Sequence, residues 1–251
     1  MRRVARGTLI TIEGLDGAGK TTLARSLARE LAAAGTRVQL LREPGGVAVS
    51  ERIRSLVKDA SLSVLPRAEA LLYAAARAQL VDERVLPLLE AGTVVLLDRF
   101  VDSSLAYQGA GRGLGVERVR AINAFATGGL RADRTLLLRV APAVGRARRL
   151  AREQPETAAA EPASAASDDP ATAASDDPPA ADAPAGESPL RDRVEREGEE
   201  FFARIASAYE QLAREEPERI RVLDAAQPRE DVLRDALLAL GEPPLAGVAH
   251  G

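Results

Sequence analysis

Short β-type runs of apolar residues alternate along this chain with longer stretches in which apolar residues recur every three or four positions. The β-type runs lie at 8–13, 38–42, 93–98, 135–140 and 219–223. The run TVVLLD at 93–98 is continuously apolar, as is typical of a parallel strand buried on both faces. Helical spacing covers 22–34, 47–58, 66–90, 116–127, a segment from Pro142, 194–212 and 230–240.

This alternation predicts an α/β fold in which five parallel strands form a doubly wound sheet with helices on both faces. A loop is expected after the third strand, at 108–115, where the sequence reads QGAGRGLG. In such a sheet the ligand site lies at the carboxyl ends of the strands. We expect residues 1–251 to form a single domain.

The turn after the first strand reads GLDGAGKT and matches the phosphate-binding pattern G-x-x-x-x-G-K-[ST] at every fixed position. A strand that enters a glycine loop and opens a helix directs backbone N–H groups and a positive helix dipole at an anion. We therefore expect a P-loop NTPase fold, in which Lys20 reaches the β- and γ-phosphates and Thr21 meets Mg²⁺. The predicted ATP-binding residues are Gly14, Leu15, Asp16, Gly17, Ala18, Gly19, Lys20, Thr21 and Thr22.

Composition narrows the chemistry further. The 251 residues include no cysteine and one histidine, His250 near the end, which excludes disulfides and thiolate zinc sites and disfavours a histidine base. No apolar run approaches the ~18 residues of a membrane span, and the apolar stretch near the start is too short for a signal peptide. We expect a cytoplasmic protein with neither a membrane nor a nucleic acid as partner.

Residues 154–189 are rich in alanine and proline, carry only acidic charges and contain no leucine, isoleucine, valine or aromatic residue. Such a segment cannot bury enough apolar surface to offset the entropy of ordering it. We therefore expect a disordered acidic insertion here and a flexible tail at 242–251.

Charged side chains at the ends of the predicted strands indicate a second ligand beside the nucleotide. Asp98 ends the third strand as a Walker B acid does, where it would help to hold Mg²⁺. A phosphoryl acceptor that is itself anionic must be held against like-charge repulsion, which requires cations beyond the phosphate loop. The candidates for this acceptor pocket are Arg42, Arg54, Arg77, Arg99 and Glu43.

The chain resembles the bacterial thymidylate kinases in six motifs that cover nearly all of it except the insertion and both tails. They are IEGLDGAGKTT (12–22), REPGG (42–46), YAAAR (73–77), DRF (98–100), SSLAYQGAGRG (103–113) and LDAAQP (223–228). The resemblance implies phosphorylation of dTMP to dTDP with Mg·ATP, and it implies a homodimer.

The resemblance also implies individual roles. Asp16 would bind the deoxyribose 3′-hydroxyl, and Tyr107 would crowd the C2′ position so that a ribose is disfavoured. Arg54 and Arg99 would hold the acceptor phosphate, with Arg99 also catalytic. Around the base, Tyr73 would stack, Arg77 would hydrogen-bond the edge, and the remaining members of the dTMP set are Glu43, Ser104 and Gln108.

Two departures and one absence qualify the resemblance. Tyr73 stands where the family commonly has phenylalanine, and Phe100 stands where tyrosine or histidine is common. Gly17 and Ala18 show no arginine in the loop, so the chain resembles the family type whose catalytic arginine comes from a mobile lid. The lid candidates flanking the insertion are Arg146, Arg148, Arg149, Arg152, Arg191 and Arg193, of which Arg149 and Arg193 join Lys20 and Arg99 as the predicted catalytic residues.

Alternatives remain for several of these assignments. The lid arginines could instead pair with Glu195, Glu197 or Glu199 on a solvated helix. The chain as a whole could be another nucleoside monophosphate kinase, a deoxynucleoside kinase, or a P-loop ATPase or switch module. A GTPase is disfavoured because no N-K-x-D motif for guanine is present.

Overall fold

The structure, a computed structural model, describes residues 6–153 and 197–241. Within these residues five parallel strands form one sheet in the order β2-β3-β1-β4-β5. The strands are β1 (Leu9–Gly14), β2 (Val38–Arg42), β3 (Val94–Asp98), β4 (Arg134–Arg139) and β5 (Ile220–Asp224). The predicted parallel sheet is confirmed, and every strand lies within one residue of its predicted bounds.

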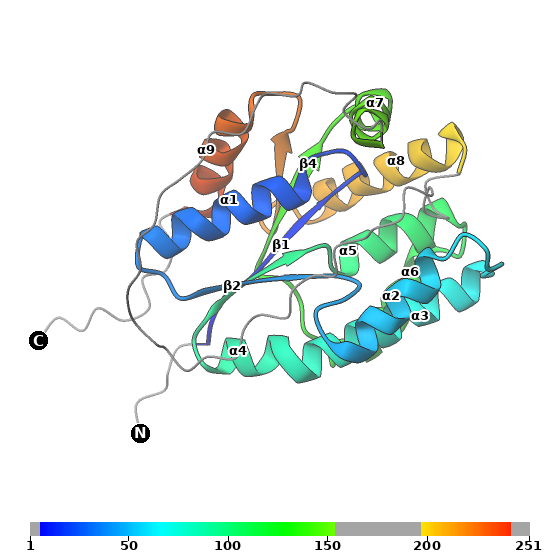
Figure 1. Cartoon of the computed structure of the whole chain (residues 1–251), viewed down its shortest axis with the longest axis horizontal. Coiled ribbons are helices and arrows are strands. Elements are labelled where there is room, and N and C mark those ends of the chain that lie inside the picture. The colour runs from blue at the N-terminus through cyan, green and yellow to red at the C-terminus, as the bar shows by residue number, and fades with distance from the viewer. Residues whose placement is uncertain (1–5, 154–196, 242–251) are drawn as a thin grey trace, which may run out of the picture.

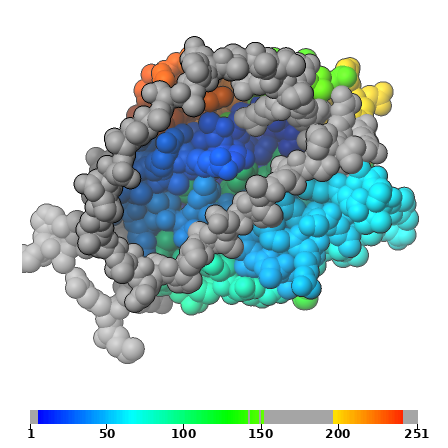
Figure 2. All heavy atoms as spheres, in the orientation of Figure 1, coloured from blue at the N-terminus to red at the C-terminus, as the bar shows by residue number. Residues whose placement is uncertain are grey.

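Helices cover both faces of the sheet (Figure 1). On one face lie α1 (Lys20–Ala33) and α9 (Arg229–Leu240), and Figure 2 shows this side with α1 at its centre between α9 and the α2–α3 pair. The other helical segments are α2 (Ala48–Lys58), α3 (Pro66–Leu80), η1 (Val81–Val85), α4 (Leu86–Glu90), α5 (Val101–Ser104), η2 (Leu105–Gly111), α6 (Val116–Ala126), α7 (Pro142–Glu153) and α8 (Glu199–Glu215).

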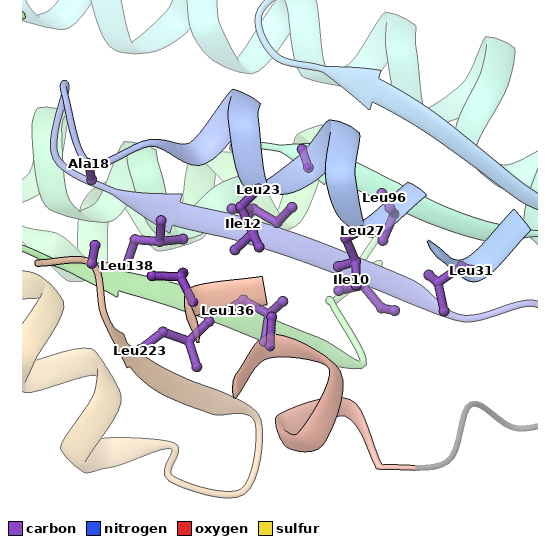
Figure 3. Packing of buried hydrophobic residues seen from close by; sticks show 14 of the residues in the cluster. Ile10, Ile12, Ala18, Leu23, Leu27, Leu31, Leu96, Leu136, Leu138 and Leu223 are labelled. Carbon is purple, nitrogen blue, oxygen red and sulfur yellow. The ribbon is translucent and has the colours of Figure 1, made fainter. Parts of the chain in front are cut away.

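The core that anchors the phosphate loop lies between β1 and α1. Leu23, Leu27 and Leu31 recur with helical spacing on α1 and face the sheet, where Ile10 and Ile12 of β1 meet them (Figure 3). All five are buried, and each such side chain contributes roughly 1.5–3 kcal/mol when it leaves water. This packing fixes both elements that flank the loop, and so fixes the loop between them.

The predicted helix over 66–90 is interrupted by a π-helical turn, η1. The backbone N–H of Leu86 donates to the carbonyl of Val81, five residues earlier, before α4 continues through Pro87. Because proline has no N–H, an α-helix running through Pro87 would lose a hydrogen bond, and the wider turn accommodates the residue. Periodicity alone predicted the apolar face but not this break.

The loop predicted at 108–115 is wrong for its first half, because residues 108–111 belong to the π-helical segment η2. A Cβ on Gly111 would lie 2.8 Å from a ring carbon of Phe201, and a Cβ on Gly109 would lie 3.1 Å from the Cα of Val116. These glycines permit close helix packing instead of a turn.

The predicted disordered insertion at 154–189 and the flexible tail at 242–251 lie outside the described residues. The helix predicted from Pro142 is present as α7, and the helical spacing from 194 is seen as α8 from Glu199. In the two described ranges, no helix is long and apolar enough to cross a membrane.

Candidate active site

The loop between β1 and α1 has the backbone that phosphate binding requires. Gly17 and Gly19 have φ values of +82° and +94°, a conformation that costs glycine little. A Cβ on Gly17 would lie 2.1 Å from the carbonyl oxygen of Gly145 in α7, so only glycine fits against that helix. The helix α1 has neither a side-chain N-cap nor an acid in its first turn. Its first N–H groups and its dipole are therefore available to an anion.

Lys20 is buried at the start of α1. Its Nζ donates to the carbonyls of Gly14 at 3.1 Å and Leu15 at 2.8 Å, and it lies 3.9 Å from Oδ1 of Asp16. Burial, with a further contribution from the Arg99 cation, lowers the pKa of Lys20 to about 8. An anionic ligand at the loop would raise this pKa and favour the charged ammonium. Its negative charge would compensate for the hydration that Lys20 loses on burial.

Thr21 and Asp98 meet as predicted for a metal site. The Thr21 hydroxyl donates to Oδ2 of Asp98 at 2.5 Å across the mouth of the loop. Hydroxyl and carboxylate oxygens are hard ligands that suit Mg²⁺. No cluster of three or more acidic, histidine or cysteine ligands occurs among residues 6–153 and 197–241. The pair therefore fits an ion that takes one or two protein ligands and completes its shell with substrate phosphates and water.

Arg99 links the phosphate loop to the opposite wall of the site. Its Nη2 forms an ion pair with Oδ1 of Asp16, and its guanidinium carbon lies 5.0 Å from the ring centroid of Tyr107. The Tyr107 hydroxyl donates to the other oxygen of Asp16 at 2.9 Å. Three predicted site residues thus form one connected cluster, and Lys20 lies beside it.

Arg99 is also the only non-glycine residue with positive φ, at +74°, in the part of the chain that the structure describes. The buried carboxylate of Glu13 stabilises this strained turn. It accepts hydrogen bonds from the Phe100 N–H at 2.7 Å and from the Ser103 hydroxyl at 2.5 Å. Burial, aided by the charge of Asp102, raises the pKa of Glu13 to about 7. The sequence analysis placed Glu13 in the first strand and in the motif at 12–22 but gave it no role of its own. Its place directly before the glycine loop was the available signal.

Arg77 is more deeply buried than its predicted role at the base edge suggests, with 2 % of its surface exposed. It donates to Oε2 of Glu43 at 2.7 Å, to the Ser104 hydroxyl at 3.0 Å and to the Phe100 carbonyl at 3.0 Å. A further donor bonds to Oδ1 of Asn123. A guanidinium has five N–H donors, so one remains for a ligand. Asn123 lay in a plain amphipathic helix and was not predicted.

The other predicted acceptor residues are spread over two walls. Arg54 lies on α2 and donates to the carbonyl of Pro44 at 3.0 Å, and Tyr73 lies on α3 one turn before Arg77. Arg42 forms an ion pair with Glu51 at 3.1 Å, so its charge is compensated there and not within the cluster around Arg99. Gln108, on η2, bonds to Glu69 at 2.9 Å.

The carboxyl ends of β1, β2 and β3 bring these walls together. Ile12 and Arg42 are both in register with Asp98, and the Arg99 N–H continues the pairing by donating to the Ile12 carbonyl at 3.0 Å. The glycine loop, the Arg99 cluster and the buried polar cluster around Arg77 therefore share one edge of the sheet.

Comparison with known proteins identifies the family of this chain. The model of the thymidylate kinase family matches residues 12–166. The thymidylate kinase of Deinococcus radiodurans is 39% identical over 239 residues, which are 95% of this chain and 98% of the relative. The chain belongs to the thymidylate kinase family. The thymidylate kinase of Halalkalibacterium halodurans is 40% identical over 235 residues, 93% of this chain and 96% of the relative.

A solved thymidylate kinase, that of Ehrlichia chaffeensis, shares the fold. It superimposes with a TM-score of 0.66 over 94% of this chain and 98% of that one, at 22% identity. The predicted P-loop NTPase fold is thereby confirmed for this thymidylate kinase family member.

In the present chain, a cavity of about 430 Å³ lies beside the phosphate loop. Its walls include Thr22 of α1, Arg148 of α7, and Gln227 and Arg229 near the start of α9. Arg148 Nη1 donates to the Ala225 carbonyl at 2.7 Å and closes one side. Sequence reasoning noted Arg148 only as a lid candidate and LDAAQP only as a motif, because nothing local shows that α7 and the β5–α9 turn meet.

The predicted lid arginines are only partly accounted for. Arg146 pairs with Glu199 at 2.8 Å, the pairing that a solvated helix would give. Arg149 belongs to α7, but its side chain lies outside the described part of the structure, and Arg193 lies wholly outside the described residues. Their catalytic role stays a prediction.

Proposed function

We propose that this chain phosphorylates dTMP to dTDP with ATP as donor, in the supply of dTTP. The observation that carries the proposal is the cluster in which Arg99, on the acceptor side, pairs with Asp16 of the phosphate loop under the ring of Tyr107. A plain ATPase has no need of a second cationic wall that touches its phosphate loop. A phosphotransferase must hold two anions within reach of each other.

On the donor side, the loop N–H groups and Lys20 would bind the β- and γ-phosphates, and the cavity beside Arg148 and Gln227 would take the nucleoside. Thr21 and Asp98 would hold Mg²⁺, which neutralises developing charge on the transferring group when it is bound. Among residues 6–153 and 197–241, Lys20 bonds only to loop carbonyls and Asp16, so it can turn to the phosphates without disturbing the core.

On the acceptor side, Arg99 and Arg54 would hold the dTMP phosphate in line with the γ-phosphate. No general base is required, because the acceptor phosphate is already ionised. Tyr73 would stack on thymine, while the remaining Arg77 donor, Ser104 and Gln108 would meet its edge. Glu43 would hold Arg77 in place, since Arg77 Nε already donates to it. We further propose that Arg149 and Arg193 belong to a lid over the donor phosphates and that 154–189 is a disordered insertion within it.

Acceptor-dependent release of ADP tests the function. We expect turnover with dTMP, weaker turnover with dUMP and dCMP, and none with thymidine, because thymidine lacks the phosphate that Arg99 and Arg54 would hold. Turnover with thymidine would indicate a nucleoside kinase. ATP hydrolysis that is independent of every acceptor would indicate an ATPase, and either result would refute the proposal.

The ring of Tyr107 is proposed to exclude a ribose, which gives a prediction with an internal control. Tyr107→Ala should raise the kcat/KM for ribothymidine monophosphate relative to dTMP by about tenfold or more, as expected when a steric contact of ~1–3 kcal/mol is removed. Tyr107→Phe keeps the ring and loses only the hydroxyl, with its bonds to Asp16 and Arg99, so it should still reject the ribose. An unchanged ratio in the alanine variant would leave Tyr107 as a packing residue.

We also propose a homodimer formed through α2, α3 and α6, which lie side by side in Figure 1. Phe125 on α6 is 91% exposed, and Leu56 on α2 and Leu71 on α3 are exposed as well. Apolar side chains gathered on neighbouring helices are typical of an interface. A second copy fits here because the family implies a dimer, and the substrates, ATP and dTMP, imply a cytoplasmic location.

Phe125→Asp should convert the dimer into a monomer in light scattering coupled to size exclusion, because a charge would be buried without a partner. Leu238→Asp on α9 is the matched control, since Leu238 is 74% exposed but lies on a different helix. A dimer that survives Phe125→Asp would place the interface elsewhere, and a monomeric parent protein would exclude the dimer.

A further inference from the structure

Glu69 is a fully buried carboxylate at the start of α3, with 0% of its surface exposed, and the proposed reaction does not use it. Its Oε1 accepts a hydrogen bond from Nε2 of Gln108 at 2.9 Å. Gln108 is itself 2% exposed. A buried carboxylate is costly, so its partners indicate what it contributes.

Arg112 compensates the charge of Glu69. Arg112 Nε donates to Oε1 of Glu69 at 3.2 Å, and Nη2 lies 3.1 Å from Oε2. The guanidinium carbon of Arg112 lies 4.8 Å from the ring centroid of Phe201, and its Nη1 pairs with Glu197. Glu69 is therefore held as a charged acceptor in a fixed position, at the point where α3 meets η2.

The contact with Glu69 decides which way the Gln108 amide faces. A carboxylate only accepts hydrogen bonds, so the amide group that meets it must be the NH₂ and not the carbonyl. Gln108 Oε1 consequently turns away from Glu69, and it has no hydrogen-bond partner among residues 6–153 and 197–241. This oxygen is not one of the buried atoms without a partner, so its fixed, open acceptor position is available to a ligand that donates a hydrogen bond.

The neighbouring polar groups present the complementary pattern. Ser104 lies four residues before Gln108 on the same helical segment, and its hydroxyl accepts from Arg77 at 3.0 Å, so the hydroxyl proton remains to be donated. Arg77 has one further N–H donor. The wall thus offers donors at Ser104 and Arg77 and an acceptor at Gln108.

Thymine and cytosine differ in this same pattern. Thymine carries an N3–H donor beside an O4 acceptor, whereas cytosine carries an N3 acceptor beside an N4 amine donor. We infer that Glu69 is a positioning residue for base selectivity: it fixes Gln108 so that Oε1 receives the N3–H of thymine and meets the N3 of cytosine as a second acceptor. The inference rests on the proposed function and deepens it by naming what selects the base.

The test compares kcat/KM for dTMP with kcat/KM for dCMP. Glu69→Gln keeps the shape but offers both a donor and an acceptor, so the Gln108 amide is free to turn. We expect the ratio of kcat/KM for dTMP to kcat/KM for dCMP to fall by at least about tenfold, the effect of one mispaired buried hydrogen bond. The KM for dTMP should rise and the KM for dCMP should fall. The KM for ATP should not change.

Glu197→Gln is the matched control, because it removes the other carboxylate on Arg112 without touching Gln108. It should leave the base ratio unchanged. An equal loss of activity with both bases in Glu69→Gln would assign a purely structural role and overturn the inference, as would a base ratio that stays at the parent value. If Glu69→Gln melts below the assay temperature, Glu69→Asp is measured instead, since it keeps the charge for Arg112 and withdraws the oxygen from Gln108. The same fall in ratio is then expected.

The parent protein separates this inference from the proposed function. A parent that turns over no dTMP refutes both. A parent that turns over dTMP, with Glu69 variants that keep its base ratio, refutes only the role of Glu69.

Discussion

Replacing Lys20 by alanine should reduce kcat for dTMP phosphorylation by at least about 10²–10³-fold while the protein stays folded. The ammonium would stabilise charge that develops on the transferring phosphoryl group, and no other side chain can supply a compact cation from inside the loop. Within the part of the chain that the structure describes, Lys20 bonds only to the Gly14 and Leu15 carbonyls and to Asp16, so its loss removes little from the core. Steady-state ADP release and the thermal midpoint measure the two effects separately.

Lys58→Ala is the matched control, because Lys58 is the only other lysine of the sequence and lies at the end of α2. It should keep the activity of the parent protein. Activity of Lys20→Ala within tenfold of the parent would refute the assignment of the phosphate loop.

Replacing Arg99 should lower kcat by about 10²-fold, the cost expected when an acceptor is misplaced by ~1 Å. Arg99→Gly is the sharper variant, since glycine adopts the φ of +74° at this turn without strain and removes the guanidinium. We therefore expect a folded protein whose thermal midpoint is retained and whose kcat falls by about 10²-fold. Arg99→Lys should recover only part of the activity, because an ammonium cannot bond to a phosphate through two parallel donors.

The kcat and KM values for dTMP decide the role of Arg99. A rise in KM alone, with kcat unchanged, would mean that Arg99 contributes uniform binding and does not position the acceptor. Arg77→Ala is not an equivalent comparison. Arg77 is buried and its loss would leave Glu43 unpaired, so we expect that variant to lose stability as well as base recognition.

Local sequence pattern was enough to predict the elements and to position the residues proposed for the donor side of the site. The β-type runs and the helical spacing located every strand of the sheet, and the loop GLDGAGKT is a contiguous motif whose function depends on its own backbone. Asp98 could be placed beside Thr21 because the end of a buried parallel strand and the loop after β1 must share one edge of the sheet. Motifs such as REPGG and DRF added the acceptor residues only through family resemblance.

Interactions between segments far apart in the sequence decided the rest. Glu13 bonds to Ser103 below the turn at Arg99, Asn123 bonds to Arg77, and Glu69 bonds to Gln108. In these three contacts the partners are 39 to 90 residues apart in the sequence. Charged and polar residues on a helix look alike in sequence whether they face water or a buried partner, because periodicity reports the apolar face and not what the polar atoms meet. The sequence by itself therefore determined the fold, the phosphate-loop motif and the pairing of Thr21 with Asp98. Only the tertiary structure decided which buried polar groups surround the proposed acceptor site, since that depends on packing between α3, η2 and α6.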